Sequence, residues 1–232
     1  MPKKAGIAIV AVGAVLILSA LLLLLYNRYE DAHAGQEAES LLENVEAVIE
    51  MKTIKVPAIS TQATDTPAAT APNRPDASKI LAPTPLDPEM PVVVLDGYEY
   101  VGYVEIPALG LKLPVMSEWD YTRLKLAPCR QFGSSRTDDL VIAAHNYENH
   151  FGRLKELSEG DTVIFTDMEG IVNTYSVKKI ETLNPNEVDA VQNSGYALVL
   201  YTCTKGGKTR VTVFCDRVKV ITPSPSPTQV EK

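Results

Sequence analysis

Three residues with complementary chemistry lie in the C-terminal half of the chain. His145 directly follows the apolar run 140–144, and Cys203 follows the apolar run 196–201. Arg210 comes seven residues after the cysteine, across a Lys-Gly-Gly-Lys turn that would fold the chain back as a hairpin. Each side chain is therefore expected at the end of a strand, facing a cleft. A nucleophilic thiol, an imidazole for proton transfer and a fixed cation for a developing oxyanion are what acyl transfer requires.

Other chemistries have less support. The net charge of −7 disfavours nucleic-acid binding, which needs a basic face. The three cysteines form no C-x-x-C pair, and no His/Cys/Asp spacing suits a metal. Gly207-Lys208-Thr209 ends like a phosphate-binding loop, but Thr202 stands where the first glycine of that motif belongs. We therefore expect no cofactor.

Cysteine placement alone does not settle the role of Cys203. A free cysteine at a strand end is more often a small buried hydrophobe than a nucleophile. Cys215 follows Val211 and Val213 at period two and is expected in the core, whereas Cys129 is expected in a loop or at a helix end. A disulfide between Cys129 and Cys215 is conceivable only because the domain is expected outside the cell.

The N-terminus predicts a membrane anchor. Residues 1–4 form a short basic start, and residues 5–26 form an uninterrupted apolar run of 22 residues, enough for a helix to cross a bilayer. The basic start favours a cytoplasmic N-terminus with the rest of the chain outside. Ala32-His33-Ala34 resembles a signal-peptidase site, but the apolar run is longer than a signal peptide needs. We assign His33 no role.

Two segments separate the anchor from the next apolar region. Residues 27–52 are acidic, and an apolar stripe of three- and four-residue steps predicts a helix, which we interpret as a solvated stalk. Residues 53–91 hold eight of the sixteen prolines and predict a disordered spacer. Residues 223–232 predict a similar disordered tail, which leaves 92–222 as the folded domain.

Residues 92–222 are dominated by short apolar runs, many of them rich in β-branched or aromatic residues and bounded by turn residues. Helices are expected only at 118–126, 151–157 and 186–191. This pattern predicts a mainly β fold, a small closed or nearly closed β-barrel with a few short helices, preceded by the transmembrane helix. The expected strands are 100–106, 111–115, 140–144, 162–165, 172–177, 196–201 and 210–215.

The motifs around the three chemically suited residues resemble those of the sortases. Val199-Leu-Tyr-Thr-Cys203 resembles the Thr-Leu-x-Thr-Cys signature of that family, with Val199 in place of the first threonine. Ala144-His145-Asn146 resembles the Gly-His-Asn or Gly-His-Thr that carries the catalytic histidine of sortases. Arg210 lies on the strand after the cysteine, where sortases keep their arginine. The resemblance spans residues 98–222 and includes the order His, Cys, Arg.

This resemblance implies a cysteine transpeptidase. Sortases cleave a C-terminal sorting signal of the Leu-Pro-x-Thr-Gly type between Thr and Gly, form a thioester, and pass the protein to a peptidoglycan-precursor amine or a pilin lysine. By position, Cys203 is then the nucleophile, His145 the general acid/base, Arg210 the stabiliser of substrate and oxyanion, and Thr202 a contact to the sorting signal. The implied partners are surface proteins with sorting signals and the acceptor amine. Many sortases are tethered outside Gram-positive cells by an N-terminal span, which agrees with residues 5–26.

Departures from the family pattern leave the sortase class open. No aromatic-bearing acidic plug precedes the first strand, which disfavours the pilus-building class. The segment between Val163 and Tyr196 lacks the long added helix of class B, although the His-Asn dipeptide resembles that class. The scattered carboxylates do not predict calcium dependence.

Two other functions remain open from the sequence. An anchored cell-wall enzyme of the L,D-transpeptidase type also uses a cysteine and a histidine, but its cysteine lies in a Ser/Gly-rich context unlike that of Cys203. A non-catalytic anchored β-domain, acting as an adhesin or scaffold, would leave Cys203 no more reactive than Cys129 and Cys215.

Overall fold

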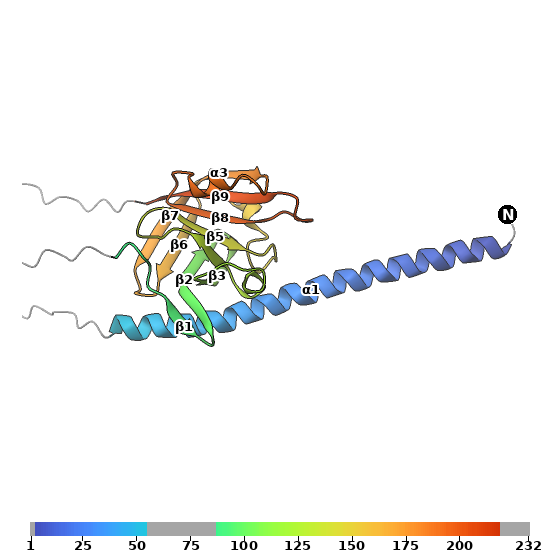
Figure 1. Ribbon diagram of the computed structural model, residues 1–232. Helices are drawn as coiled ribbons and strands as arrows, with labels where there is room; N and C mark the ends of the chain where they lie inside the picture. Colours follow the sequence, from blue (N-terminus) through green and yellow to red (C-terminus); the bar gives the residue numbers. More distant parts are fainter. Residues whose placement is uncertain (1–2, 55–86, 219–232) are drawn as a thin grey trace, which may run out of the picture.

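The computed structural model describes residues 3–54 and 87–218, with the side chains described from residue 9 onward (Figure 1). Residues 55–86 and 219–232, which contain most of the expected spacer and the whole expected tail, lie outside the described part. The described residues form a mainly β fold in which one sheet closes into a barrel, with a few short helices and one long N-terminal helix. The fold class expected from the sequence is confirmed.

The barrel closes because strand β2 pairs with β3 on one side and with β6 on the other. Among the described residues, eight strands follow one another in the order β2-β3-β4-β5-β8-β9-β7-β6, and β6 pairs again with β2. β1 lies outside this ring and pairs with β2 alone, through a hairpin turn at Asp96-Gly97. Both turn residues have positive φ, 51° and 82°, as the tightest hairpins require. The strands are β1 (Val93–Leu95), β2 (Tyr98–Ile106), β3 (Leu111–Met116), β4 (Cys129–Phe132), β5 (Leu140–Ala144), β6 (Thr162–Asp167), β7 (Val172–Leu183), β8 (Leu198–Cys203) and β9 (Arg210–Arg217).

The seven strands expected from the sequence are all present, and two more were missed. β1 is three residues long, and β4 is short and mixed in polarity, so neither has an alternating apolar pattern. Cys129, expected in a loop or at a helix end, begins β4 and is fully buried. Cys215 is a barrel-core residue as expected. Both thiols are free and belong to different apolar clusters, so no disulfide joins them.

The short helices are smaller than the sequence pattern suggested. Within the expected helical stretch 118–126 only a four-residue helix forms, and the expected helix 151–157 is a single 3-10 turn. The helix expected at 186–191 is shifted by about a residue or two. Their bounds are α2 (Arg123–Leu126), α3 (Val188–Gln192), and the 3-10 turns η1 (Pro107–Leu109) and η2 (Leu154–Glu156).

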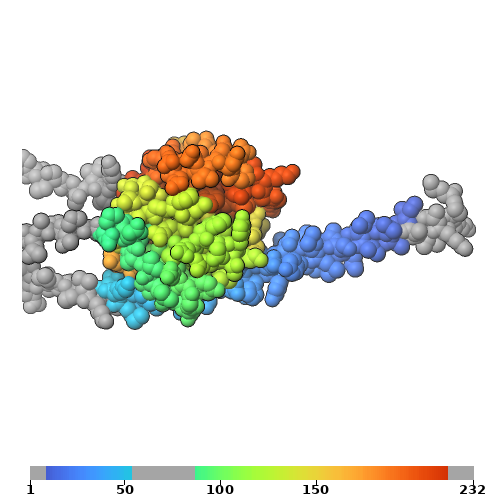
Figure 2. Space-filling model, in the orientation of Figure 1, coloured from blue at the N-terminus to red at the C-terminus, as the bar shows by residue number. Residues whose placement is uncertain are grey.

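One continuous helix, α1 (Lys3–Ile54), includes both the expected transmembrane segment and the expected acidic helix. Its first part projects from the barrel and exposes apolar side chains, and it is long and apolar enough to cross a membrane (Figures 1 and 2). Its second part packs along the barrel wall. The interpretation of residues 27–52 as a solvated stalk is therefore wrong. Its apolar stripe is a buried packing face, formed by Ala34, Ala38, Leu42, Val45 and Ile49.

The partner of this stripe is the outer face of the barrel. Tyr100, Met116, Cys129 and Ala143 are register neighbours on β2, β3, β4 and β5, and they form one buried row across these four strands. Val45 and Ile49 of α1 belong to the same apolar cluster as this row. A barrel wall that is apolar on both faces needs such a cover, because exposed apolar surface costs roughly 25 cal/mol per Å². The predicted stripe was correct, and its partner could not be seen in the sequence.

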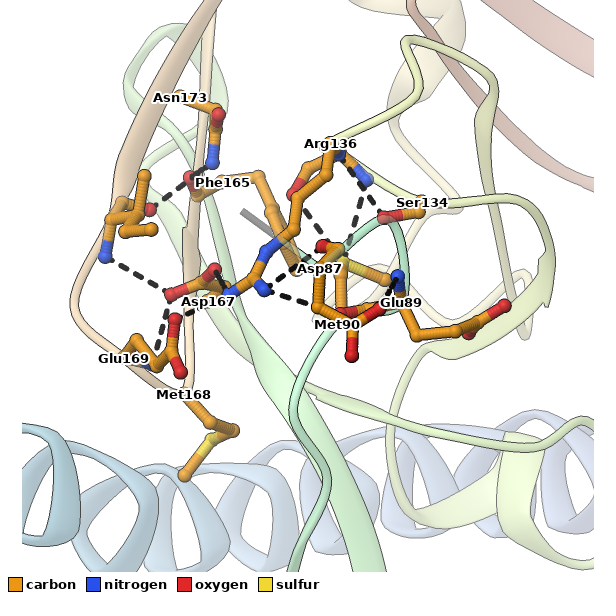
Figure 3. A network of polar contacts seen from close by, with 12 residues as sticks. Asp87, Glu89, Met90, Ser134, Arg136, Phe165, Asp167, Met168, Glu169 and Asn173 are labelled. Atoms are coloured by element: carbon orange, nitrogen blue, oxygen red, sulfur yellow. Dashed lines mark hydrogen bonds and ion pairs between the residues drawn. The ribbon is translucent and has the colours of Figure 1, made fainter. Parts of the chain in front are cut away.

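Polar contacts hold the C-terminal end of α1 and residues 87–89 at one turn of the barrel. At the C-terminal end of α1, Lys52 donates to the Met168 carbonyl (3.3 Å). Before β1, the backbone carbonyls of Asp87 and Glu89 accept hydrogen bonds from Arg136 (3.1 and 3.2 Å). The same guanidinium pairs with the buried Asp167 at 2.9 Å (Figure 3). Asp167 is the last residue of β6, and residues 168–171 connect β6 to β7, so this turn and the strand end before it adjoin both chain segments.

A stability measurement tests the helix–barrel packing. Ile49→Ala should lower the free energy of unfolding by about 2–5 kcal/mol, because it removes a large apolar side chain from the shared cluster. Met51→Ala is the matched control, since Met51 lies two residues away and is exposed; its effect should stay within about 0.5 kcal/mol. Denaturant unfolding of the full chain in detergent, followed by the fluorescence of Trp119, the one tryptophan, gives both values. Equal midpoints for the two variants would contradict the packing.

Candidate active site

The strand register brings the three chemically suited residues to one end of the barrel. β5 and β8 pair in parallel, with Ala144 opposite Thr202. His145 directly follows β5, and Cys203 is the next residue of β8. Neighbouring strands of a sheet lie about 4.8 Å apart. β8 and β9 pair in antiparallel fashion, with Cys203 opposite Arg210. The expected positions at strand ends are therefore found, and the three residues come from adjacent strands.

Cys203 and Arg210 line a cleft of about 250 Å³ at this end of the barrel. The thiol is partly exposed, whereas Cys129 and Cys215 are buried and burial raises the pKa of each of these two thiols to about 12. Cys203 is thus the one cysteine that is open to a substrate. The cleft walls come from the β3–β4 connection, β4 and the β7–β8 connection, and include Trp119, Tyr121, Leu124, Gln131, Phe132, Leu183, Pro185, Val188 and Val191.

The wall residues were not found by the sequence analysis. They lie on connections and on a strand edge, which converge on the cleft only after the barrel has closed. The one sequence signal is the aromatic pair Trp119 and Tyr121, which lies in a segment between strands, where binding residues are often found. In the structure their rings are in tilted contact, with centroids 5.1 Å apart, and both side chains are exposed.

Arg210 is held by the turn that precedes it. Its Nη1 donates to the carbonyls of Gly207 (3.0 Å) and Thr209 (3.1 Å), and Thr204 closes the turn by bonding Thr209. Within the described part of the chain, Nε and Nη2 make no hydrogen bond or ion pair. The guanidinium is therefore oriented by the backbone and still carries donors that a substrate oxygen can accept.

His145 lies at the boundary between the barrel end and α1. Its ring stacks on Tyr147, with centroids 4.0 Å apart and planes 17° from parallel. Burial, and then the charge of Lys125, lower the pKa of the imidazole, while Glu30 of α1 opposes this shift. A lowered pKa leaves the ring neutral near pH 7, which is the form that accepts a proton. The Nδ1 atom is buried without a partner in the described structure, and His145 is not among the residues that line the cleft.

The side chain of Thr202 makes a contact within the barrel and is not exposed to the cleft or to solvent. Its side chain is buried, and its hydroxyl donates to the Ala144 carbonyl at 2.9 Å. This bond joins the last paired residues of β5 and β8, directly before His145 and Cys203. Contact between the Thr202 side chain and a substrate stays a prediction, and the position of Thr202 is better explained by the register that it supports.

The polar loop Asn146-Tyr-Glu-Asn-His150 predicts a solvated surface position for His150, and this prediction is wrong. The side chain is fully buried, its ring meets Tyr147 edge-on at 5.5 Å, and it lies beside Ala34 of α1. Neither ring nitrogen has a hydrogen-bond partner of ordinary geometry among the described residues. The sequence suggested a polar loop, but this loop is covered by the docked helix. Burial lowers the pKa of His150 to about 4.

No metal site accompanies these residues. Within residues 3–54 and 87–218 there is no group of three or more His, Cys, Asp or Glu side chains that could hold a metal ion. His33, to which we assign no role, is exposed on α1, and its Nδ1 lies 3.4 Å from Oε1 of Glu37.

Residues 104–218 match the family model of the sortase domain. The match runs from within β2 to the end of the described barrel and includes Cys203, His145 and Arg210. The chain therefore belongs to the sortase family, which makes it a cysteine transpeptidase by family. No curated protein matches the sequence.

Solved sortase structures are among those similar to this chain. Sortase C1 of Streptococcus agalactiae is 25% identical with a TM-score of 0.48, covering 55% of this chain and 72% of that chain. Sortase C of Clostridium perfringens, solved with the C-terminal cell wall sorting motif, is 23% identical with a TM-score of 0.46, covering 52% and 71%. A Clostridium perfringens sortase D5 transpeptidase is 18% identical with a TM-score of 0.45, covering 52% and 79%.

The buried His150 makes stability depend on pH. The unfolded histidine binds a proton near pH 6.5, but the folded one does so only near pH 4, so the unfolded state carries more protons between these values. Stability should therefore be complete above pH 6.5 and fall by roughly 3 kcal/mol as the pH drops to about 4. Urea unfolding at pH 7.5 and pH 5 should show about 2 kcal/mol of this loss.

Two substitutions assign the pH effect to His150. In His150→Gln the loss of stability between pH 7.5 and pH 5 should shrink. In His33→Gln, which changes an exposed histidine on α1, it should remain. An unchanged pH dependence in His150→Gln would show that another group is responsible.

Proposed function

We propose that the chain is a membrane-anchored sortase that cleaves a Leu-Pro-x-Thr-Gly-type sorting signal through a thioester on Cys203 and transfers the acyl group to an amine. The observation that carries this proposal is the partly exposed thiol of Cys203, set opposite Arg210 in a cleft of a sortase domain. His145 follows the strand beside it. The reaction needs a nucleophile, a proton carrier and an oxyanion donor, and we propose no cofactor.

The acylation step starts at the sulfur of Cys203. Sγ attacks the threonine carbonyl carbon, and the negative charge that develops on the carbonyl oxygen is stabilised by the guanidinium of Arg210. His145 holds the thiol proton and delivers it to the glycine nitrogen as the Thr–Gly bond breaks. The products are a Cys203 thioester and a free glycine amine. An adjacent cation and a nearby proton acceptor both favour the thiolate over the thiol.

The second step transfers the acyl group from Cys203 to the acceptor amine. The acceptor amine attacks the thioester carbonyl, Arg210 again stabilises the oxyanion, and His145 takes the proton that the amine nitrogen must lose. Collapse of the intermediate releases the Cys203 thiolate and leaves a new amide bond. A cell-wall precursor or a pilin lysine supplies such an amine.

The apolar cleft walls suit the first residues of the sorting signal. Leucine and proline side chains are apolar, and Leu183 at the end of β7, with Val188 and Val191 of α3, offers matching surface near Cys203. The aromatic side chains of Trp119 and Tyr121 border the same cleft. Burial of the leucine and proline would position the Thr–Gly bond over the thiol.

The exposed apolar part of α1 supports the anchor in this proposal. We propose one span at residues 5–26, with the basic N-terminus in the cytoplasm and the catalytic domain outside. The partners are then substrate proteins that carry sorting signals, the acceptor amine and the bilayer.

A transpeptidation assay tests the proposal. The purified full chain in detergent should convert a soluble Leu-Pro-x-Thr-Gly peptide and an amine into the amide product, detected by mass spectrometry, with a Cys203 acyl adduct in the absence of amine. Cys203→Ala and His145→Ala should form no product, while His33→Gln should match the unmodified chain. Product formation by Cys203→Ala would exclude the thioester route.

Substitution of Arg210 separates a catalytic role from a surface role. Loss of a preorganised oxyanion donor typically lowers kcat about 10²–10³-fold, or roughly 2.7–4 kcal/mol, and we expect this for Arg210→Ala. Arg210→Lys should be nearly as impaired, because lysine lacks the planar fork that bonds the turn carbonyls and a substrate oxygen together. KM should change little, since the interaction is made in the transition state. Near-normal kcat in Arg210→Ala would remove this residue from the site.

A further inference from the structure

Strand β5 and helix α1 run in opposite directions along the barrel. The loop before β5 carries Arg136, which pairs with Asp167. The next residue, Met168, accepts a hydrogen bond from Lys52 of α1 at its carbonyl. At the end of β5, the following loop carries Asn149, whose side chain donates to the Asp31 carbonyl at 3.2 Å. Residues 31 to 52 of a helix span about 32 Å. The barrel therefore lies along this length of α1, and the end that holds His145 and Cys203 is the end nearest the apolar segment.

The distance from the apolar segment to the catalytic end is short. Tyr26 ends the apolar run, and Glu30, whose charge acts on His145, follows four residues later, or about 6 Å along the axis. Tyr26, Glu30 and Tyr147 line one cavity at this junction. The headgroup layer adds roughly 5–8 Å on each side of the hydrocarbon core. If residues 5–26 fill the core, the catalytic end of the barrel lies at the level of the headgroups.

The side chains at this end suit a lipid interface. Tyr26 and Tyr29 are exposed on α1, and tyrosine is enriched where a span leaves the hydrocarbon. The β8–β9 turn lies at the same end, because β8 runs parallel to β5, and it exposes Lys205 and Lys208. In Figure 1 the hairpin of β8 and β9 points toward the N-terminal part of α1. Lysine ammonium groups close to an anionic headgroup layer are attracted to it electrostatically.

Close contact keeps α1 in this position. Ala34 and Ala38 are buried against the barrel, and a side-chain carbon at Gly35 would lie 2.9 Å from Nδ2 of Asn149. Small residues at 34, 35 and 38 thus allow the helix to approach the loop that follows His145. The packed helix therefore sets the distance between the barrel and the apolar segment.

We propose that α1 holds the barrel against the bilayer with its catalytic end facing the lipid headgroups, so that Tyr29, Lys205 and Lys208 form a membrane-contact surface. The partner of this surface is an anionic lipid bilayer. The inference rests on the proposed function in one respect, namely that residues 5–26 span the membrane. It implies that the scissile bond of a substrate embedded in the same membrane must lie within a few residues of the headgroups.

Fluorescence quenching by lipids tests the orientation. The full chain with Cys203→Ala is placed in nanodiscs that contain phosphatidylglycerol and a lipid with a nitroxide on its headgroup. One labelled variant carries Glu148→Cys, at the catalytic end, and the other Val172→Cys, beside the β6–β7 turn; both positions are exposed and make no polar side-chain contact in the described structure. Cys129 and Cys215 are buried and stay unlabelled. The Glu148→Cys probe should lose most of its emission, and the Val172→Cys probe should emit as in discs without nitroxide.

A matched pair of substitutions tests whether helix packing causes this orientation. Ala38→Glu places a carboxylate in the buried contact, whereas Ala47→Glu makes the same change at an exposed position of α1. The difference in quenching between the two probes should vanish with Ala38→Glu and persist with Ala47→Glu. Equal quenching of both probes in the otherwise unmodified chain, or stronger quenching of the Val172→Cys probe, would overturn the proposal even if Ala38→Glu failed to fold.

Activity on a soluble peptide separates this inference from the function it rests on. With Cys203 intact, the Ala47→Glu variant should cleave a soluble sorting peptide as fast as the unmodified chain, because Ala47 is exposed and lies outside the cleft and the buried helix contact. If the unmodified chain cleaves no soluble peptide, the proposed function fails while the quenching result still decides the orientation. If cleavage is normal and quenching is equal at both probes, the orientation alone is wrong.

Discussion

The parallel pairing of β5 with β8 is the interaction on which the site depends. It places His145 and Cys203 at the same barrel end and one strand apart, although 58 residues separate them in the chain. A slip of one residue would turn every side chain of one strand to the opposite face of the sheet. The Thr202–Ala144 hydrogen bond secures the last paired position before the catalytic candidates. Burial of all five residues of β5 fixes the register from both faces.

Burial on both faces in turn depends on helix α1. The inner face of β5 packs in the barrel core, but Ala143 belongs to the outer cluster that Val45 and Ile49 complete. The same helix that is apolar enough to enter a membrane is therefore part of the folded domain. One continuous element joins the apolar N-terminal segment, the barrel wall and the loop after His145, so the position of the site relative to the apolar segment follows from packing.

The contact between α1 and the barrel also buries polar atoms without partners. The hydroxyl of Tyr100 and both ring nitrogens of His150 are buried and unpaired among the described residues, and both side chains lie at or near the helix contact. Each such atom costs about 1–3 kcal/mol, which the apolar contacts of the helix must offset. The part of this cost that comes from His150 falls next to the catalytic end, whereas the opposite end is held by the bonded network of Arg136.

Sequence alone determined the local chemistry and the strand pattern. The apolar runs before His145 and Cys203 and the Gly-Gly turn before Arg210 predicted three strand-end residues, because alternation and turn chemistry act over a few neighbouring positions. The apolar steps of residues 27–52 likewise predicted a helix with one packing face. What covers that face, where His150 lies and which connections wall the cleft were decided only by the tertiary structure. These features depend on contacts between segments more than a hundred residues apart, such as Asn149 with Asp31, and no local pattern records them.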